Sequence, residues 1–143
     1  MKNTLTAGAT LPELVLALSL CAILATITIA GSASLRDRSS VRAASTELVS
    51  ALHLARSSAQ AESRVVALRF DTASGRALVL AHPDTLLDLP LGVWYAVRLG
   101  ATRDSIAYGP TGRGYGAANT TLTIRRRGAA DTIVVSRLGR VKS

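Results

Sequence analysis

The acidic residue with the most unusual setting in this chain is Glu13. It lies in the segment GATLPEL (8–14), directly before the 22 residues of Leu14–Leu35, none of which is charged. An ionised carboxylate costs roughly 3 kcal/mol at the centre of a membrane-spanning helix, so a stabilising partner is expected. Thr10 and Glu13 have the spacing of a capping box, in which the carboxylate accepts a hydrogen bond from the backbone N–H of the capping residue. Helix capping is therefore the first interpretation of this acid.

A second interpretation is electrostatic. If the chain is cut after Gly8, the new amino group of Ala9 lies four residues before Glu13. A bond within one chain is geometrically awkward, but the same amine on a neighbouring copy can neutralise the carboxylate. Because an unpaired charge in an apolar setting is costly, a pair between Glu13 and a neighbour's Ala9 would drive assembly. Both interpretations stay open at this stage.

Basic residues near the C-terminus form the second group of residues that could bind a ligand. Residues 98–143 carry a net charge of +7, against +1 for residues 1–97. Such a surface binds phosphate backbones without base specificity and with strong salt dependence. The candidate DNA-binding residues are Arg125, Arg126, Arg127, Arg137, Arg140 and Lys142. The simpler interpretation of the first three is a solvated strand end that discourages strand pairing.

Little material exists for other chemistry. The 143 residues include one cysteine, Cys21, and two histidines, His53 and His82. One cysteine excludes an internal disulfide framework and a Cys-based zinc site. The glycine-rich GRGYG at 112–116 is followed by no predicted helix of adequate length, which argues against a phosphate-binding loop. No catalytic triad or pair of carboxylates stands out, so the sequence predicts no enzyme, no cofactor and no metal site.

The uncharged run predicts a membrane anchor. At about 1.5 Å per residue, Leu14–Leu35 reaches roughly 33 Å, enough for a hydrocarbon core of about 30 Å. A secretory signal peptide cut near residues 31–33 is the alternative, but its apolar region is usually only about 7–15 residues long. Lys2 favours a cytoplasmic N-terminus, whereas three arginines just beyond the run favour the opposite orientation.

The remaining sequence predicts the elements that position these residues. Small apolar side chains recur at three- and four-residue intervals from Val41 to Ala59, the pattern of an amphipathic helix. No break separates this pattern from the apolar run, so one helix is predicted from Leu11 to Glu62. Strands are predicted at 64–70, 76–81, 93–99, 105–108, 120–126 and 131–137, with a loop at 82–92, a glycine-rich connection at 109–119 and turns at 71–75 and 127–131. This order indicates an α+β fold.

Two segments resemble a known family. Gly8, Thr10, Leu11 and Glu13 match the leader end and helix start of type IV pilin-like proteins, with Ala9 where Phe is usual. The C-terminal third is similar to the pseudopilin H/FimT subgroup, which has a Tyr/Phe-x-Pro-x-Gly-Arg turn and a terminal Ser-x-x-Gly-Arg motif. The matching residues are Tyr108, Pro110, Gly112, Arg113, Ser136, Gly139, Arg140, Val141 and Lys142.

The resemblance implies a division of the chain into four parts. Residues 1–8 would be a leader, which a prepilin peptidase removes between Gly8 and Ala9 before methylating the Ala9 amine. Residues 9–35 would be the transmembrane and assembly half of the helix, and residues 36–63 its amphipathic half. Residues 64–143 would form a β-rich periplasmic domain, expected to contain two antiparallel sheets.

The resemblance also implies a function. It suggests a minor pseudopilin, a structural subunit of the type II secretion filament that drives protein export across the outer membrane. The alternative is a FimT-like minor pilin of a type IV pilus that binds DNA for uptake through its basic tail. Expected partners are other pilins or pseudopilins, the prepilin peptidase, the inner membrane and exported cargo. The expected location is the inner membrane, with a single span, a cytoplasmic N-terminus and a periplasmic domain.

Overall fold

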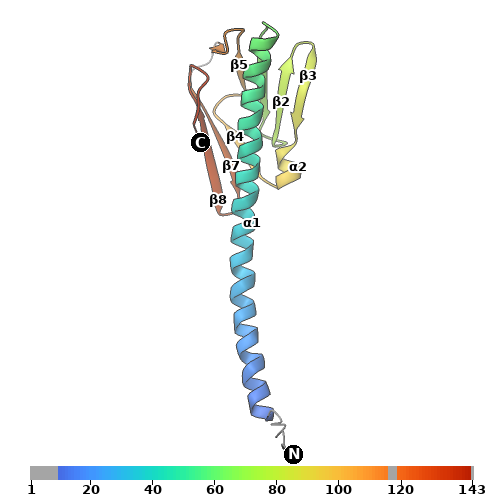
Figure 1. The fold of residues 1–143 in the computed structure, drawn as a ribbon, viewed down its shortest axis with the longest axis vertical. Coiled ribbons are helices and arrows are strands. Elements are labelled where there is room, and N and C mark those ends of the chain that lie inside the picture. Colours follow the sequence, from blue (N-terminus) through green and yellow to red (C-terminus); the bar gives the residue numbers. More distant parts are fainter. Residues whose placement is uncertain (1–9, 116–118, 143) are drawn as a thin grey trace, which may run out of the picture. The chain divides into compact units, whose positions relative to one another are not determined.

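The computed structural model describes residues 10–115 and 119–142, the side chains of residues 27–31 excepted. The chain divides into two compact units, residues 1–35 and 36–143, and each is described separately. Helix α1 (Leu11–Ala61) contributes residues to both units (Figure 1). Its bounds agree with the predicted helix of 11–62. Pro12 is tolerated because it lies in the first turn, where its missing N–H would have no helical hydrogen-bond partner.

The described part of the first unit is helical from Leu11 onward, and its apolar side chains are uncovered. The Thr10 carbonyl accepts hydrogen bonds from the backbone N–H groups of Glu13 and Leu14, at 3.0 and 3.1 Å. The exposed large apolar residues here are Leu11, Leu14, Val15, Leu16, Leu18, Leu20, Ile23, Leu24 and Leu35. Among the residues that the structure describes, no helix combines the length and the apolar character needed to cross a bilayer.

The second unit contains two antiparallel sheets. The first has the order β3-β2-β1-β5-β6, and the second has the order β4-β7-β8-β9. The strands of the first sheet are β1 (Val66–Asp71), β2 (Arg76–Ala81), β3 (Asp84–Leu89), β5 (Ser105–Tyr108) and β6 (Gly114–Tyr115). Those of the second are β4 (Arg98–Ala101), β7 (Thr120–Arg126), β8 (Ala129–Val135) and β9 (Val141–Lys142). The predicted α+β fold, with a long helix and two sheets, is confirmed.

The amphipathic part of α1 packs against both sheets. In Figure 1 this part of the helix runs in front of the strands, with β2 and β3 to its right and β7 and β8 to its left. The apolar face contains four alanines, whose small side chains let the helix axis approach the sheets. The buried residues of this face are Val41, Ala44, Leu48, Ala51, Leu52, Ala55 and Ala59. They form one core with the inward-facing side chains of the strands.

The segment 82–92 differs from the predicted loop, because it contains strand β3. Asp84 and Asp88 lowered the expected strand propensity, but both side chains are exposed on the edge strand and pair with arginines. Asp88 forms an ion pair with Arg76 on β2, which raises the pKa of the Arg76 guanidinium. Strand β3 joins β2 through a turn that includes the cis peptide bond His82–Pro83. Charge pairing across the edge therefore supports a strand that propensity alone did not predict.

The predicted strand 93–99 is also wrong at its beginning. Pro90 precedes a short helix, α2 (Leu91–Tyr95), and its carbonyl accepts hydrogen bonds from Val93 and Trp94, both at 3.0 Å. The helix stops at Ala96, which has a positive φ of 52°. Buried Leu91 anchors this helix in the core, and only from Arg98 onward does the chain become strand β4. Tertiary packing has overridden the β-propensity of VWYAV here.

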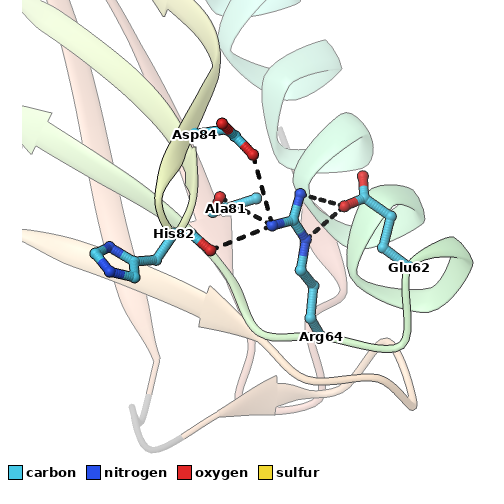
Figure 2. Close-up of polar contacts among 5 residues, drawn as sticks. All are labelled: Glu62, Arg64, Ala81, His82 and Asp84. Carbon is cyan, nitrogen blue, oxygen red and sulfur yellow. Dashed lines mark hydrogen bonds and ion pairs between the residues drawn. The ribbon is translucent and has the colours of Figure 1, made fainter.

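The end of α1 is fastened to the β2–β3 turn by Arg64. Figure 2 shows the Arg64 guanidinium between Glu62 and the turn. Its Nη1 donates to the carbonyl oxygens of Ala81 and His82, at 3.1 and 3.2 Å, and lies 3.9 Å from Asp84 Oδ2. An ion pair with Glu62 completes the group. These contacts fix where the chain leaves the helix and enters the first sheet.

Packing of α1 against the sheets predicts a contrast between two leucines of the same helix. Leu48 is fully buried, whereas Leu54 is 38% exposed. We expect Leu48→Ala to lower the free energy of unfolding by about 3 kcal/mol, through lost burial and a residual cavity. Leu54→Ala should cost less than about 1 kcal/mol. Denaturant unfolding of the detergent-solubilised chain measures both, and equal losses would contradict this packing.

Candidate functional site

Glu13 lies at the start of α1 with its carboxylate directed toward the capping residue. The Thr10 backbone nitrogen is 3.5 Å from Glu13 Oε2. This long hydrogen bond is the one that the carboxylate accepts in the predicted capping box. This contact agrees with the capping interpretation. Gly8 and Ala9 lie outside the described residues, so the predicted cleavage, methylation and Glu13–Ala9 pair remain predictions.

Hydroxyl groups on the apolar part of α1 are bonded within the helix. Ser19 Oγ donates to the Val15 carbonyl at 2.8 Å, and Thr26 Oγ1 donates to the Ile23 carbonyl at 2.7 Å. Such bonds back to the preceding turn satisfy a hydroxyl without water. This part of the helix thus presents apolar side chains outward and keeps these two polar groups paired.

Arg126, at the end of β7, is the centre of a polar cluster in the second unit. Its Nε lies 2.9 Å from Asp37 Oδ1, and its Nη1 donates to Ser40 Oγ at 2.8 Å and to the Tyr95 carbonyl at 2.6 Å. Asp37 is only 8% exposed, so its carboxylate needs this partner. Arg126 therefore ties β7 to α1 and to the last residue of α2.

This arrangement distinguishes the three consecutive arginines from one another. The guanidinium of Arg126 bonds to other residues of the fold, whereas the simpler interpretation expected all three arginines to be solvated at a strand end. Arg127 is 76% exposed on its side chain, lies 4.0 Å from Asp37 and has a positive φ of 47° in the β7–β8 turn. Arg125 is exposed on the strand. The turn lies at 127–128, which lets β8 begin at Ala129 instead of the predicted 131.

A basic groove lies beside this cluster. It has a volume of about 500 Å³ and is lined by Ala96, Arg98, Arg125, Arg126 and Arg127. Arg98 enters the group because β4 and β7 pair with Arg98 opposite Arg125. The sequence did not indicate Arg98 as a site residue, because the register of β4 depends on the unpredicted helix α2. Like charges opposite each other in a sheet are destabilising, so an anion would stabilise them.

The predicted basic residues of the tail form a separate group. Arg137, Arg140 and Lys142 are exposed and lie beyond or beside the end of β8. The β7–β8 pairing places Arg126 opposite Ala129 and Thr120 opposite Val135. At about 3.3 Å per residue, the length of β8 separates the two arginine groups by roughly 20 Å. The six predicted residues therefore do not form one continuous patch.

The glycine motifs of the C-terminal third pack around a buried tyrosine. Gly139 has a φ of 77°, and a Cβ atom there would come within 2.8 Å of Tyr108 Cε1. The Ser136 hydroxyl accepts a hydrogen bond from the Arg140 N–H at 3.1 Å and closes this turn. Tyr108 is fully buried, and burial raises the pKa of its phenol, while Arg56 partly offsets the shift. The motif residues Tyr108, Ser136 and Gly139 thus have a structural role.

Histidine and cysteine show no grouped arrangement. His53, His82 and Cys21 are exposed. Within residues 10–115 and 119–142, no cluster of three His, Cys, Asp or Glu residues is placed to hold a metal ion.

The long helix packed on two antiparallel sheets is the fold of a type IV pilin-like protein. Two crystal forms of the minor pilin FimU of Pseudomonas aeruginosa (strain PAO1) are similar to the chain. One has a TM-score of 0.64 with 17% identity over 76% of this chain and 90% of FimU, and the other has a TM-score of 0.60 with 17% identity over 71% and 90%. This likeness shows the fold.

A family model described as type II transport protein GspH matches residues 44–139. This chain belongs to the GspH family, as a pilin-like protein. The match covers most of the amphipathic part of α1, nearly all the strands and the Tyr108–Gly139 contact. No curated protein matches the chain significantly.

The Arg126 cluster predicts a large difference between neighbouring arginines. We expect Arg126→Ala to lower the free energy of unfolding by about 2 kcal/mol, because it leaves the Asp37 carboxylate and the Tyr95 carbonyl without this donor. Arg125→Ala removes a neighbouring, exposed arginine and should change stability by less than about 0.5 kcal/mol. Denaturant unfolding of both variants tests this, and similar losses would show that Arg126 does not hold the cluster together.

Buried Tyr108 predicts a loss of stability at high pH. Its folded-state pKa lies above the ordinary value of 10.0, so the unfolded chain loses the phenol proton first and stability falls as pH rises above about 10. Tyr108→Phe should weaken this dependence. It should not destabilise the chain at neutral pH, because the hydroxyl has no hydrogen-bond partner among the described residues.

The matched control is Tyr115→Phe, since Tyr115 is 65% exposed. This variant should keep the wild-type dependence of unfolding on pH. Identical pH profiles for the wild type and Tyr108→Phe would contradict a role for the buried phenol.

Proposed function

We propose that this chain is a minor pseudopilin, a structural subunit of the periplasmic filament of a type II secretion system. Membership of the GspH family supports this role. In this proposal the leader 1–8 is removed by a prepilin peptidase and the Ala9 amine is methylated. The chain is anchored in the inner membrane by one span, with its N-terminus in the cytoplasm and its second unit in the periplasm. It takes part in export as a filament component and not as an enzyme.

The observation that carries the proposal is the uncovered apolar surface at the start of α1. Large apolar side chains there are more than half exposed, from Leu11 at 77% to Leu24 at 56%. Apolar surface of this extent on one element marks a site of association with lipid or protein. In the proposal it contacts lipid before assembly and neighbouring helices within the filament. The internal bonds of Ser19 and Thr26 suit both environments.

Glu13 then has two successive roles. In the free subunit its carboxylate accepts the hydrogen bond from the Thr10 N–H at the start of the helix. In the filament it pairs with the Ala9 amine of a neighbour, so that neither charge remains uncompensated in the apolar bundle. Filament formation would thus depend on a charge that one chain alone leaves without a cationic partner.

Substitution of Glu13 separates the two roles. Glutamine keeps the capping acceptor and removes the charge. We expect Glu13→Gln to be inserted in the membrane and folded, yet to enter filaments at least tenfold less than the wild type, because the pair is lost. Glu47→Gln, which neutralises an acid in the second unit, is the control and should assemble normally. Site-specific crosslinking in sheared filaments measures incorporation, and normal incorporation of Glu13→Gln would contradict charge pairing.

A second candidate function is DNA uptake as a minor pilin of a type IV pilus. The exposed group of Arg137, Arg140 and Lys142 favours it, because these side chains have no ion-pair partner in the described part of the chain. The type IV minor pilin FimU has a similar fold. In this alternative the tail would hold phosphate groups, and affinity would fall steeply with salt.

A gel-shift titration of the detergent-solubilised chain tests this alternative. DNA binding through the tail predicts a shift at low salt that is lost when Arg137, Arg140 and Lys142 are all changed to alanine. The corresponding change of Arg98, Arg125 and Arg127 is the control and should retain the shift. Absence of a shift at low salt would exclude the DNA-binding function and leave the secretion role.

A further inference from the structure

One end of the second unit combines exposed arginines with an exposed tryptophan. Arg126 holds the β7–β8 turn and the end of α2 against Ser40, and Figure 1 shows this turn and α2 at the same end of the sheets. Beside Tyr95, Trp94 is 58% exposed and Val93 is 78% exposed. We call this surface the basal face, and define it by Arg36, Arg38, Val93, Trp94, Arg98, Arg125 and Arg127.

The basal face lies close to the beginning of the second unit. Arg36 is the first residue of this unit, directly after the uncharged run in the sequence. From Arg36 to Ser40 the helix rises only about 6 Å. The headgroup region of a bilayer is roughly 5–8 Å thick on each side. Because Arg36 and Arg38 follow the uncharged run directly in the sequence, a membrane that holds this run would lie within a few residues of the basal face.

Charge and residue type both fit an anionic lipid surface. The five arginines of the basal face are exposed, and the nearest buried acid, Asp37, is already paired with Arg126. Each arginine close to an anionic membrane favours the bound state roughly fivefold. Tryptophan is enriched at membrane interfaces, because its ring is apolar and its N–H finds a polar partner. Nucleic acid would use the arginines but leaves exposed Val93 unexplained.

We propose that the basal face docks on anionic phospholipid headgroups of the membrane that holds the chain before assembly. The proposal rests on the proposed function, because it requires α1 to be anchored in that membrane. Docking would hold the second unit against the bilayer. Entry into a filament would then require release of these arginines and of Trp94 from the lipid.

Trp94 is the one tryptophan of the chain and reports on docking directly. The full chain is reconstituted in nanodiscs of phosphatidylcholine alone or with phosphatidylglycerol, and quenching by brominated lipids is recorded. We expect the fluorescence emission of Trp94 to shift to shorter wavelength and to be quenched in the anionic discs. In neutral discs, or in high salt, both effects should be lost.

Two charge-matched variants test which residues are responsible. Changing Arg98, Arg125 and Arg127 to glutamate should abolish the shift. The control changes Arg113, Arg137 and Arg140 to glutamate, which alters net charge equally at exposed positions beside the end of β8, where Gly114 lies against the Arg137 carbonyl and the Ser136 N–H bonds the Arg140 carbonyl. The control should retain the shift. Equal loss in both variants would show that only net charge matters and would overturn the proposal.

The remaining outcomes separate this proposal from the proposed function. A chain that resists carbonate extraction but shows the same Trp94 emission in both lipids would overturn docking and leave the anchor intact. A chain that does not enter the discs would overturn the anchor and docking together. A response of Trp94 to a short DNA duplex in neutral discs, without a response to anionic lipid, would identify the basal face as a nucleic-acid surface and overturn docking.

Discussion

The uncovered apolar surface at the start of α1 is the constraint on which the rest of the proposed function depends. Leu11, Leu16 and Leu18 are at least 70% exposed, and no part of the described chain covers them. Exposed apolar area of this kind is unfavourable in water, at roughly 25 cal/mol per Å². In the proposed function, lipid removes this cost before assembly and neighbouring helices remove it within the filament. In the proposed function, Glu13 would make the exchange specific, because its charge requires a partner that a lipid tail does not provide.

The second unit is held together at its two ends by different contacts, one polar and one a close packing of a glycine on an aromatic ring. At one end, Arg126 joins β7 to α1 and α2 through Asp37, Ser40 and the Tyr95 carbonyl. At the other, Gly139 packs on the Tyr108 ring, so the tail motif closes the sheet end. The motif that indicated the family is therefore largely structural. The exposed arginines of the two ends remain available for anions about 20 Å apart.

Much of this fold could be predicted from residue patterns, since the alanine and leucine stripe of α1 has an unambiguous period and the alternating strands follow turn residues. The failures have physical causes. Strand β3 is supported by ion pairs of Asp84 with Arg64 and of Asp88 with Arg76 on the neighbouring strand, which strand propensity does not take into account. Helix α2 forms because Pro90 initiates it and Leu91 is buried in the core, against the β-propensity of the segment.

The site was predicted less completely than the fold. The arginine run at 125–127 was visible in the sequence, but the partner of Arg126 was not. Asp37 is almost 90 residues away, and its immediate sequence neighbours, Arg36 and Arg38, are also arginines that could pair with it. Arg98 joined the group only through the pairing of β4 with β7. Charge counts thus showed that the C-terminal third is basic, but they could not tell which guanidinium is structural.

The most direct test of the account is the mass of the mature N-terminus of the native protein. Anchoring and assembly as proposed predict a chain that begins at Ala9 and carries one methyl group on its amine. A chain that still begins at Met1, or one that begins close to Ser34, would contradict the account.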